Sequence, residues 1–325
     1  MNYIKLVRPI NLFIIATTMY LFRYCIVAAS PYKIFSISHV LTDMQFVLLV
    51  LSTVFIAAGG YVINDIFDVN IDAINKPEKV LIGYKISEKQ AYNIYKVLCV
   101  AGIICTLILG FSTNNFRLSM LPIIIMVILN FYAHTFKKQL IVGNFMIALC
   151  TSFTILIIAL FESTSNIGTA NEWYVRSGIA IAAIVYSIFA FLTTFLREII
   201  KDAEDQKGDE LNGARTIPIV YGEKGAKLAS YIICILLLIL LGSFAWFFPS
   251  LNIKNVSIFV LVGLILPLLI IIFFIIKAKT VSNYHFVSNL IKVFMCLGIA
   301  TMLYFRSVVG PYTFVQYANF IKKLF

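Results

Sequence analysis

Residues 44–72 read MQFVLLVLSTVFIAAGGYVINDIFDVNID. The first part is an apolar run of about 20 residues, which is the length that a helix needs to cross a bilayer. The run then ends in a polar segment where Asn64, Asp68 and Asp72 recur at four-residue steps. Residues at this spacing share one face of a helix. The stretch therefore predicts a membrane helix whose end carries a row of carboxylates.

Similar apolar runs recur along the whole chain. Hydrophobic residues make up 61% of the 325 residues and charged residues only 13%, about half the charged share of a soluble domain. Each run should be helical, because lipid cannot satisfy open backbone groups. The sequence predicts an all-α integral membrane protein, a single domain over residues 1–325, with nine spans at 10–30, 44–64, 93–112, 117–136, 140–161, 174–197, 227–248, 255–276 and 286–306.

The first run is not expected to be a cleaved signal peptide, since Arg23 interrupts it and eight more runs follow. Of the 26 Lys and Arg residues, 18 fall on the side of the N-terminus and of the loops after even-numbered spans. The positive-inside rule makes that side cytoplasmic. We expect a multi-pass protein of a prokaryotic plasma membrane, surrounded by membrane lipids, with its N-terminus in the cytoplasm.

Other partner classes are not indicated. The net charge of +11 does not form a basic soluble face with interleaved aromatic residues, so we expect no nucleic acid partner. The six cysteines include no C-x-x-C pair and the three histidines lie far apart, so neither a zinc site nor a disulfide framework is expected. No obligatory protein partner is evident.

The acidic residues are concentrated in two segments. Of 15 acidic residues, 12 lie within residues 65–88 and 198–223. The second segment follows the sixth run, and its residues 197–209 read REIIKDAEDQKGD, with acids again at three- and four-residue steps. We call Asn64, Asp65, Asp68 and Asp72 the first stripe, and Asp202, Asp205 and Asp209 the second stripe.

Two carboxylate stripes at one expected membrane face predict a shared ion site, because like charges at this spacing repel one another without a cation. Mg²⁺ typically binds through one or two carboxylates plus substrate phosphates, which favours a magnesium–diphosphate site. Calcium is less favoured, since neither segment has the twelve-residue EF-hand pattern. The same face offers cations for a diphosphate at Lys76, Lys79, Lys137, Lys138, Arg197 and Lys201.

Simpler interpretations remain open for these residues. The acidic segments can be solvated loops, and the lysines can serve only to set the topology. The chain has no G-x-x-x-x-G-K-[ST] loop, so hydrolysis of a nucleotide through a P-loop is not indicated. A polar head held at the end of apolar helices leaves the rest of the ligand among apolar side chains, which suits a lipid tail.

The two stripes resemble the signatures of the UbiA-type intramembrane prenyltransferases, N-D-x-x-D-x-x-x-D and D-x-x-D-x-x-x-D. The resemblance covers nearly the whole chain. It also includes Arg8-Pro9-Ile10-Asn11, residues 132–144 with their basic pair and Gly143-Asn144, and Gly213-Ala214-Arg215-Thr216. Two signatures in this order, each after an even-numbered span, are highly specific for this family.

The resemblance implies a nine-helix bundle with a central cavity, capped by the helical loops after spans 2 and 6. It implies that both stripes hold Mg²⁺, with catalytic roles for Asp68, Asp72, Asp205 and Asp209. The donor, a prenyl diphosphate, would contact Asn64, Lys76, Lys79, Tyr132, Lys137, Lys138, Asn144, Arg197 and Lys201. The family's N-R-P-x-R-P segment is replaced here by Asn75-Lys76-Pro77-Glu78-Lys79-Val80, and lysine keeps the charge of arginine but loses its bidentate fork.

Several acceptors are compatible with these residues. The second segment is most similar to that of enzymes that alkylate geranylgeranylglyceryl phosphate at a hydroxyl, in the digeranylgeranylglyceryl phosphate synthase-like branch. Aromatic prenylation in quinone synthesis, of the 4-hydroxybenzoate or dihydroxynaphthoate type, is the alternative, along with haem farnesylation and chlorophyll-type prenylation. We expect the reaction to begin with ionisation of the allylic carbon–oxygen bond.

A transporter is the rival from another functional class, because ionisable residues in membrane helices often mark ion pathways. The acids here lie at the ends of spans on one side, and the spans themselves are nearly free of acids. No relay to the opposite side is visible, which favours an enzyme.

Overall fold

The computed structural model describes residues 2–28, 40–164, 170–247 and 254–308. Within these ranges the regular elements are helices, apart from an isolated bridge between Ile82 and Ile86. This confirms the predicted all-α class.

The described ranges contain nine helical segments that are long and apolar enough to cross a membrane. They confirm the nine predicted spans. Their bounds are Pro9–Val27, Asp43–Phe67, Glu88–Thr113, Phe116–His134, Val142–Glu162, Val175–Leu211, Ile217–Trp246, Asn255–Lys277 and Val281–Ser307.

Two of these segments extend well beyond the apolar runs. The sixth continues to Leu211, whereas the run ends at residue 197, and the seventh begins at Ile217, whereas the run begins at residue 227. Hydropathy reports only the part of a helix that suits lipid. The residues that prolong the sixth helix include Lys, Glu, Gln and Ala, which favour helix in water as well.

The chain divides into two compact units, each described here by itself. Unit 1 consists of Met1–Thr17, Leu41–Cys150 and Lys201–Ala226. Unit 2 consists of Thr18–Val40, Thr151–Ile200 and Lys227–Phe325. The single domain and the central cavity stay predictions.

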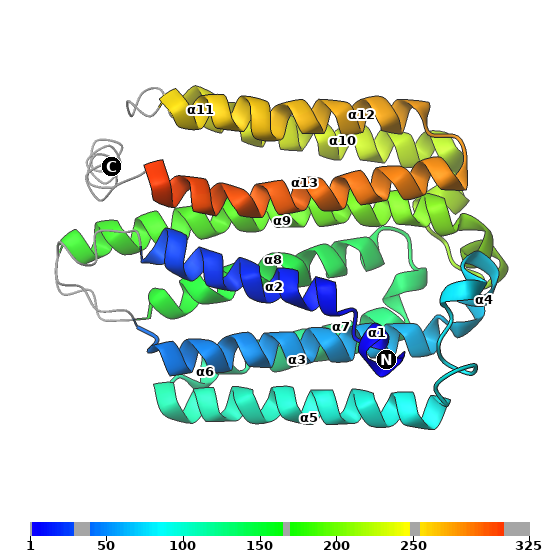
Figure 1. Cartoon of the computed structure of the whole chain (residues 1–325), viewed down its shortest axis with the longest axis horizontal. Coiled ribbons are helices and arrows are strands. Elements are labelled where there is room, and N and C mark those ends of the chain that lie inside the picture. Colours follow the sequence, from blue (N-terminus) through cyan, green and yellow to red (C-terminus); the bar gives the residue numbers. More distant parts are fainter. Residues whose placement is uncertain (1, 29–39, 165–169, 248–253, 309–325) are drawn as a thin grey trace. The chain divides into compact units, whose positions relative to one another are not determined.

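Unit 1 holds both aspartate stripes. Its α3 and α5 lie side by side, and α3 also packs on α7 (Figure 1). The helices that lie in unit 1 wholly or in part are α1 (Asn2–Leu6), α2 (Pro9–Leu21), α3 (Asp43–Phe67), α4 (Val69–Asn75), η2 (Pro77–Lys79), α5 (Glu88–Thr113), α6 (Phe116–Ser119), α7 (Leu121–His134), η3 (Phe136–Lys138), α8 (Val142–Glu162), α9 (Ala170–Leu211) and α10 (Ile217–Phe247).

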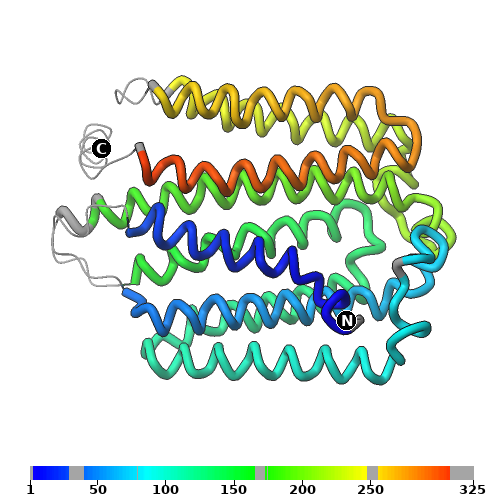
Figure 2. The backbone as a smooth tube through the Cα atoms, in the orientation of Figure 1, coloured from blue at the N-terminus to red at the C-terminus, as the bar shows by residue number. Residues whose placement is uncertain are grey.

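Unit 2 contains the remaining helices and the rest of α2, α8, α9 and α10. Within it, α13 packs on α12 and on η1 (Figure 2). Its other helices are η1 (Phe22–Val27), α11 (Lys254–Val260), η5 (Leu261–Ile265), α12 (Leu266–Lys277) and α13 (Val281–Val308).

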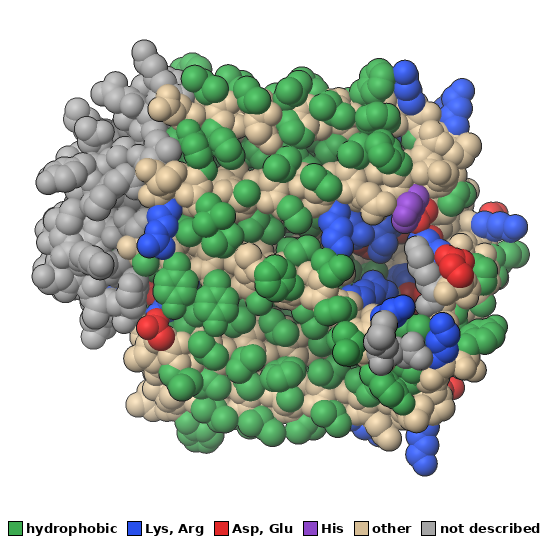
Figure 3. Space-filling view, viewed as in Figure 1, with side chains coloured by type: hydrophobic (Ala, Val, Ile, Leu, Met, Phe, Trp, Pro, Cys, Tyr) green, Lys and Arg blue, Asp and Glu red, His purple; other side chains and the backbone are tan. Residues whose placement is uncertain are grey.

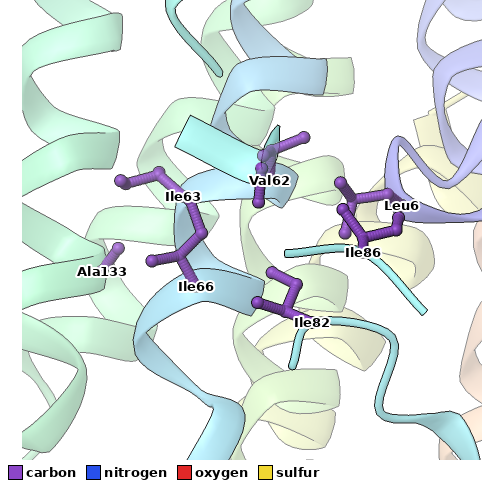
Figure 4. Close-up of a cluster of buried hydrophobic side chains, with 8 residues drawn as sticks. Leu6, Val62, Ile63, Ile66, Ile82, Ile86 and Ala133 are labelled. Carbon is purple, nitrogen blue, oxygen red and sulfur yellow. The ribbon is translucent and has the colours of Figure 1, made fainter. Parts of the chain in front are cut away.

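A buried hydrophobic cluster in unit 1 fixes the end of α3 that carries the first stripe (Figure 4). Val62, Ile63 and Ile66 of α3 pack there with Leu6 and Ile86, together with three further side chains. Asn64 and Asp65 lie between these residues in the sequence, and their side chains contact Asp68 and Arg8 instead. On the face shown in Figure 3, many of the charged side chains gather toward the side where Figure 1 places α4, and hydrophobic side chains cover much of the rest.

Candidate functional site

The first stripe follows one helical path although α3 and α4 are separate elements. Asp68 connects them, and the backbone N–H of Asp72 donates to the carbonyl of Asp68 at 2.8 Å. Nδ2 of Asn64 donates to Oδ2 of Asp68 at 2.6 Å. The two side chains thus lie on one face, as their spacing predicts.

Asp65 has a different partner. Nη2 of Arg8 lies 2.5 Å from Oδ1 of Asp65, and the Arg8 guanidinium stands 5.1 Å from the centre of the Tyr61 ring. Arg8 sits in the turn between α1 and α2. It connects the N-terminal segment to the first stripe through charge and through a cation–π contact.

The second stripe lies on the part of α9 that belongs to unit 1. Nδ2 of Asn144, near the start of α8, donates to Oδ2 of Asp202 at 2.8 Å. Asp205 and Asp209 follow Asp202 at three- and four-residue steps. Asp209 is buried, with 5% of its surface exposed.

Side chains at the end of α4 connect the two stripes. Nζ of Lys76 lies 2.8 Å from Oε1 of Glu204 and 2.7 Å from Oδ1 of Asp205. Nδ2 of Asn75 donates to the carbonyl of Asp205 at 2.8 Å, and Oδ1 of Asn75 accepts from the N–H of Gly208 at 2.9 Å. The segment after the first stripe is therefore tied to the helix that carries the second.

Lys137 lies among carboxylates of both stripes. Its Nζ donates to Oδ2 of Asp68. Burial by itself lowers the pKa of Lys137, but the carboxylates of Asp68, Asp209 and Asp72 outweigh this effect and raise the pKa above its usual value. Lys137 is thus held in its charged form between the stripes.

Gly143, near the start of α8, allows η3 to lie close to that helix. A Cβ at Gly143 would lie 2.8 Å from the carbonyl oxygen of Phe136 and 2.9 Å from Cα of Lys137. A side chain there would push η3 away from α8. Lys138, the next residue, is exposed, and its carbonyl accepts a 2.9 Å hydrogen bond from the N–H of Arg215.

The two stripes interact electrostatically. The pKa of Asp72 is raised to about 6, first by burial and then by the charge of Asp68, with further contributions from Asp65 and Asp205 against an opposing effect of Lys137. Asp205 belongs to the other stripe. A cation bound beside Asp72 would therefore relieve repulsion that comes from both stripes.

The other predicted residues lie as follows, and the charge of Lys201 acts on Asp209 of the second stripe. Tyr132 is buried on α7, and Lys201 is half-buried one turn before Asp205. The side chain of Lys79 lies outside the described part of the chain. Arg197 belongs to unit 2, where its Nη1 lies 3.3 Å from Oε1 of Glu198. Its assignment stays a prediction.

Sequence reasoning gave no role to three residues of the network: Arg8, Asn75 and Glu204. Arg8 was visible as part of an N-terminal motif but had no assigned partner. Asn75 and Glu204 lie within the two acidic segments, and no spacing rule marks them. Only the approach of α4 to α9 shows what they contact.

Comparison with known proteins gives a consistent match. The model of the UbiA prenyltransferase family matches residues 19–311. A digeranylgeranylglyceryl phosphate synthase of Sulfurisphaera tokodaii is 32% identical over 253 residues, which cover 77% of this chain and 80% of the relative. Another, from Korarchaeum cryptofilum, is 30% identical over 266 residues and covers 80% of this chain and 85% of the relative.

Solved structures share the fold. A structure reported for digeranylgeranylglyceryl phosphate synthase in membranes has a TM-score of 0.61 at 23% identity, over 94% of this chain and 97% of that chain. A UbiA homologue from Archaeoglobus fulgidus, bound to DMAPP and Mg²⁺, has a TM-score of 0.54 at 18% identity, over 93% of this chain and 99% of that chain. These structures extend the likeness over almost the full length of the chain.

Proposed function

The chain belongs to the UbiA prenyltransferase family, and on this basis we propose that it transfers a geranylgeranyl group from its diphosphate to geranylgeranylglyceryl phosphate. The reaction would require Mg²⁺ and release diphosphate. The acceptor is suggested by relatives in several archaea that act as digeranylgeranylglyceryl phosphate synthases. The observation that carries the proposal is the convergence of two carboxylate stripes, with Lys137 between them, inside unit 1.

The residues present fit a magnesium ion shared with a diphosphate. All side chains of the two stripes offer oxygen atoms, which Mg²⁺ prefers. Oδ1 of Asn64 is buried and has no hydrogen-bond partner within the described part of the chain. No group of three or more His, Cys, Asp or Glu side chains arranged to hold a metal ion occurs among the described residues. Mg²⁺ commonly binds through one or two carboxylates and takes its other ligands from water and phosphate.

We assign Asn64, Asp65, Asp68 and Asp72, with Asp202, Asp205 and Asp209, to Mg²⁺. When bound, the ion would take up negative charge that develops on the departing diphosphate. Lys137, held charged between the stripes, would contact the same phosphates. The remaining donor contacts are assigned to Lys76, Lys79, Tyr132, Lys138, Asn144, Arg197 and Lys201.

The chemical step would begin with cleavage of the bond between the allylic C1 and the diphosphate oxygen. The electron pair leaves with the diphosphate, and the resulting allylic cation is attacked by the hydroxyl oxygen of the acceptor. The proton of that hydroxyl then passes to a carboxylate of the stripes.

An allylic cation reacts with water, so the chain must exclude solvent from the reacting carbon. The apolar side chains of the membrane-spanning helices supply such surroundings. The protein would act in a prokaryotic plasma membrane with its N-terminus in the cytoplasm, so that both stripes face the compartment of the charged substrates.

The test uses the purified full chain in lipid vesicles with geranylgeranyl diphosphate and a choice of acceptors. Mass spectrometry should find digeranylgeranylglyceryl phosphate only when geranylgeranylglyceryl phosphate and Mg²⁺ are both present, and EDTA should abolish the product. A prenylated 4-hydroxybenzoate or dihydroxynaphthoate in place of the glycerol product would support the quinone type instead. Ion flux without any diphosphate release would favour the transporter and overturn the proposal.

A further inference from the structure

Asn75 makes a paired contact with the backbone of α9. It is the last residue of α4, and its side-chain amide both donates to the carbonyl of Asp205 and accepts from the N–H of Gly208, at 2.8 and 2.9 Å. The amide of Asn has the same donor and acceptor as a peptide group, so it can bind two backbone sites of one helix at once. The three residues all lie in unit 1.

Gly208 is needed for this contact to form. A Cβ at Gly208 would lie 2.5 Å from Nδ2 and 2.7 Å from Oδ1 of Asn75. Glycine is unfavourable inside a helix, and Gly208 is not among the glycines with positive φ, which are Gly83, Gly213 and Gly222. The backbone conformation therefore does not require glycine here, whereas the close approach of Asn75 does.

The contact lies next to carboxylates of both stripes. Asp72 of the first stripe lies three residues before Asn75, about one turn of helix. On α9, Asp205 provides one of the two backbone partners, and Asp209 directly follows the other, Gly208. Lys76, the residue after Asn75, is paired with Glu204 and Asp205. Any shift of Asn75 along α9 would therefore change the separation of the carboxylates on both sides.

We propose that Asn75 is a positioning residue that, seated against Gly208, sets the separation between the first and second stripes and thereby the Mg²⁺ requirement of the enzyme. This inference rests on the proposed function for its link to Mg²⁺. The seating of Asn75 on Gly208 can be tested without substrate or metal.

The first experiment measures thermal unfolding of four forms of the full chain in the absence of Mg²⁺ and donor: wild type, N75A, G208A and N75A/G208A. G208A should lower the Tm of the wild type, because the new methyl group displaces Asn75. In the N75A background the same change should leave the Tm unchanged or raise it, since alanine favours helix over glycine. G242A is the matched control, because a Cβ at Gly242 of α10 meets no atom within 4 Å.

The second experiment measures the Mg²⁺ concentration for half-maximal turnover in the same forms. N75A and G208A should each raise it by about tenfold, as expected for the loss of two hydrogen bonds, with kcat at saturating Mg²⁺ within about threefold of wild type. The double variant should have the same Mg²⁺ requirement as N75A. A role confined to overall stability would not shift the Mg²⁺ requirement in this way.

The outcomes separate the two proposals. The positioning role is wrong if G208A lowers the Tm equally in the wild-type and N75A backgrounds. It is also wrong if N75A and G208A both keep the wild-type Mg²⁺ requirement. If G208A does not fold, a double variant that folds supports the role, and a double variant that also fails contradicts it. Coupled Tm changes in a chain that releases no diphosphate with any donor would uphold the seating and refute the proposed function.

Discussion

Nδ2 of Asn144 lies 2.8 Å from Oδ2 of Asp202 and ties the start of α8 to the second stripe. Asn144 is buried, with 8% of its surface exposed. Its neutral amide donates to a carboxylate without adding negative charge to the site. The pairing explains why an asparagine can stand beside a row of aspartates, where another acid would increase repulsion.

Replacing this amide by a carboxylate should weaken the site. In N144D a buried carboxylate would face the half-buried carboxylate of Asp202, so we expect kcat/KM for the prenyl donor at low Mg²⁺ to fall by at least about tenfold. Higher Mg²⁺ should recover part of the loss. The matched control is N70D, which adds the same charge at an exposed position of α4. Wild-type kinetics of N144D at every Mg²⁺ concentration would contradict the pairing.

The raised pKa of Asp72 predicts a pH dependence of metal binding. The carboxyl group takes up a proton as the pH falls through about 6, and a protonated carboxyl cannot bind Mg²⁺ as a carboxylate does. The apparent Mg²⁺ affinity should therefore fall by up to about tenfold per pH unit below pH 6. Titration of diphosphate release with Mg²⁺ between pH 5 and pH 8 measures this. A flat affinity over that range would refute the assignment of Asp72.

The same shift predicts how stability without metal depends on pH. A folded-state pKa raised from 3.8 to about 6 favours the protonated form, so the contribution of Asp72 is fully present below about pH 4. It is lost as the pH rises through 6. Comparison of Tm against pH for wild type and D72N in EDTA isolates this contribution, which should be absent from D72N.

Reversing the charge of Lys137 and Lys138 should weaken donor binding. In K137E/K138E two negative charges replace the basic pair, of which Lys137 contacts Asp68, and the KM for donor should rise by at least about tenfold. K89E/K96E is the control, because it reverses two exposed lysines on the same expected side of the membrane. If K137E/K138E changes insertion but leaves donor affinity unchanged, the lysines serve topology alone.

A fluorinated donor tests the order of bond changes. Fluorine near the reacting carbon disfavours an allylic cation but not a direct displacement. We expect the fluorinated donor to bind normally and to react at least about tenfold more slowly, since each 1.4 kcal/mol of barrier costs a factor of ten. Reaction at the rate of the parent donor, at equal occupancy, would rule out ionisation as the first step.

Much of this arrangement follows from local pattern. Lipid-length apolar runs predict the nine spans, and the four-residue spacing of Asn64 and Asp68 predicts the face on which their side chains meet. The end of α9 could not be predicted from hydropathy, because charged helix formers carry the helix on to Leu211.

The pairing of Lys76 with Glu204 and Asp205 could not be predicted either. These residues are separated by more than a hundred positions, and they meet only because the chain after α4 folds back on α9. Spacing rules compare residues within one helix and carry no information about contacts between helices. The same holds for Asn75, whose partners are backbone atoms that no sequence pattern marks.

The central proposal is that the two stripes act as one magnesium–diphosphate site. Its most direct test is Mg²⁺-dependent diphosphate release from geranylgeranyl diphosphate by wild type, D68A and D209A in lipid, at saturating Mg²⁺. D68A removes a carboxylate from the first stripe, and D209A removes one from the second. Each substitution should reduce turnover by at least about a hundredfold, because the charge of the departing diphosphate would lose its stabilisation. Turnover near the wild-type rate in both variants would contradict the account.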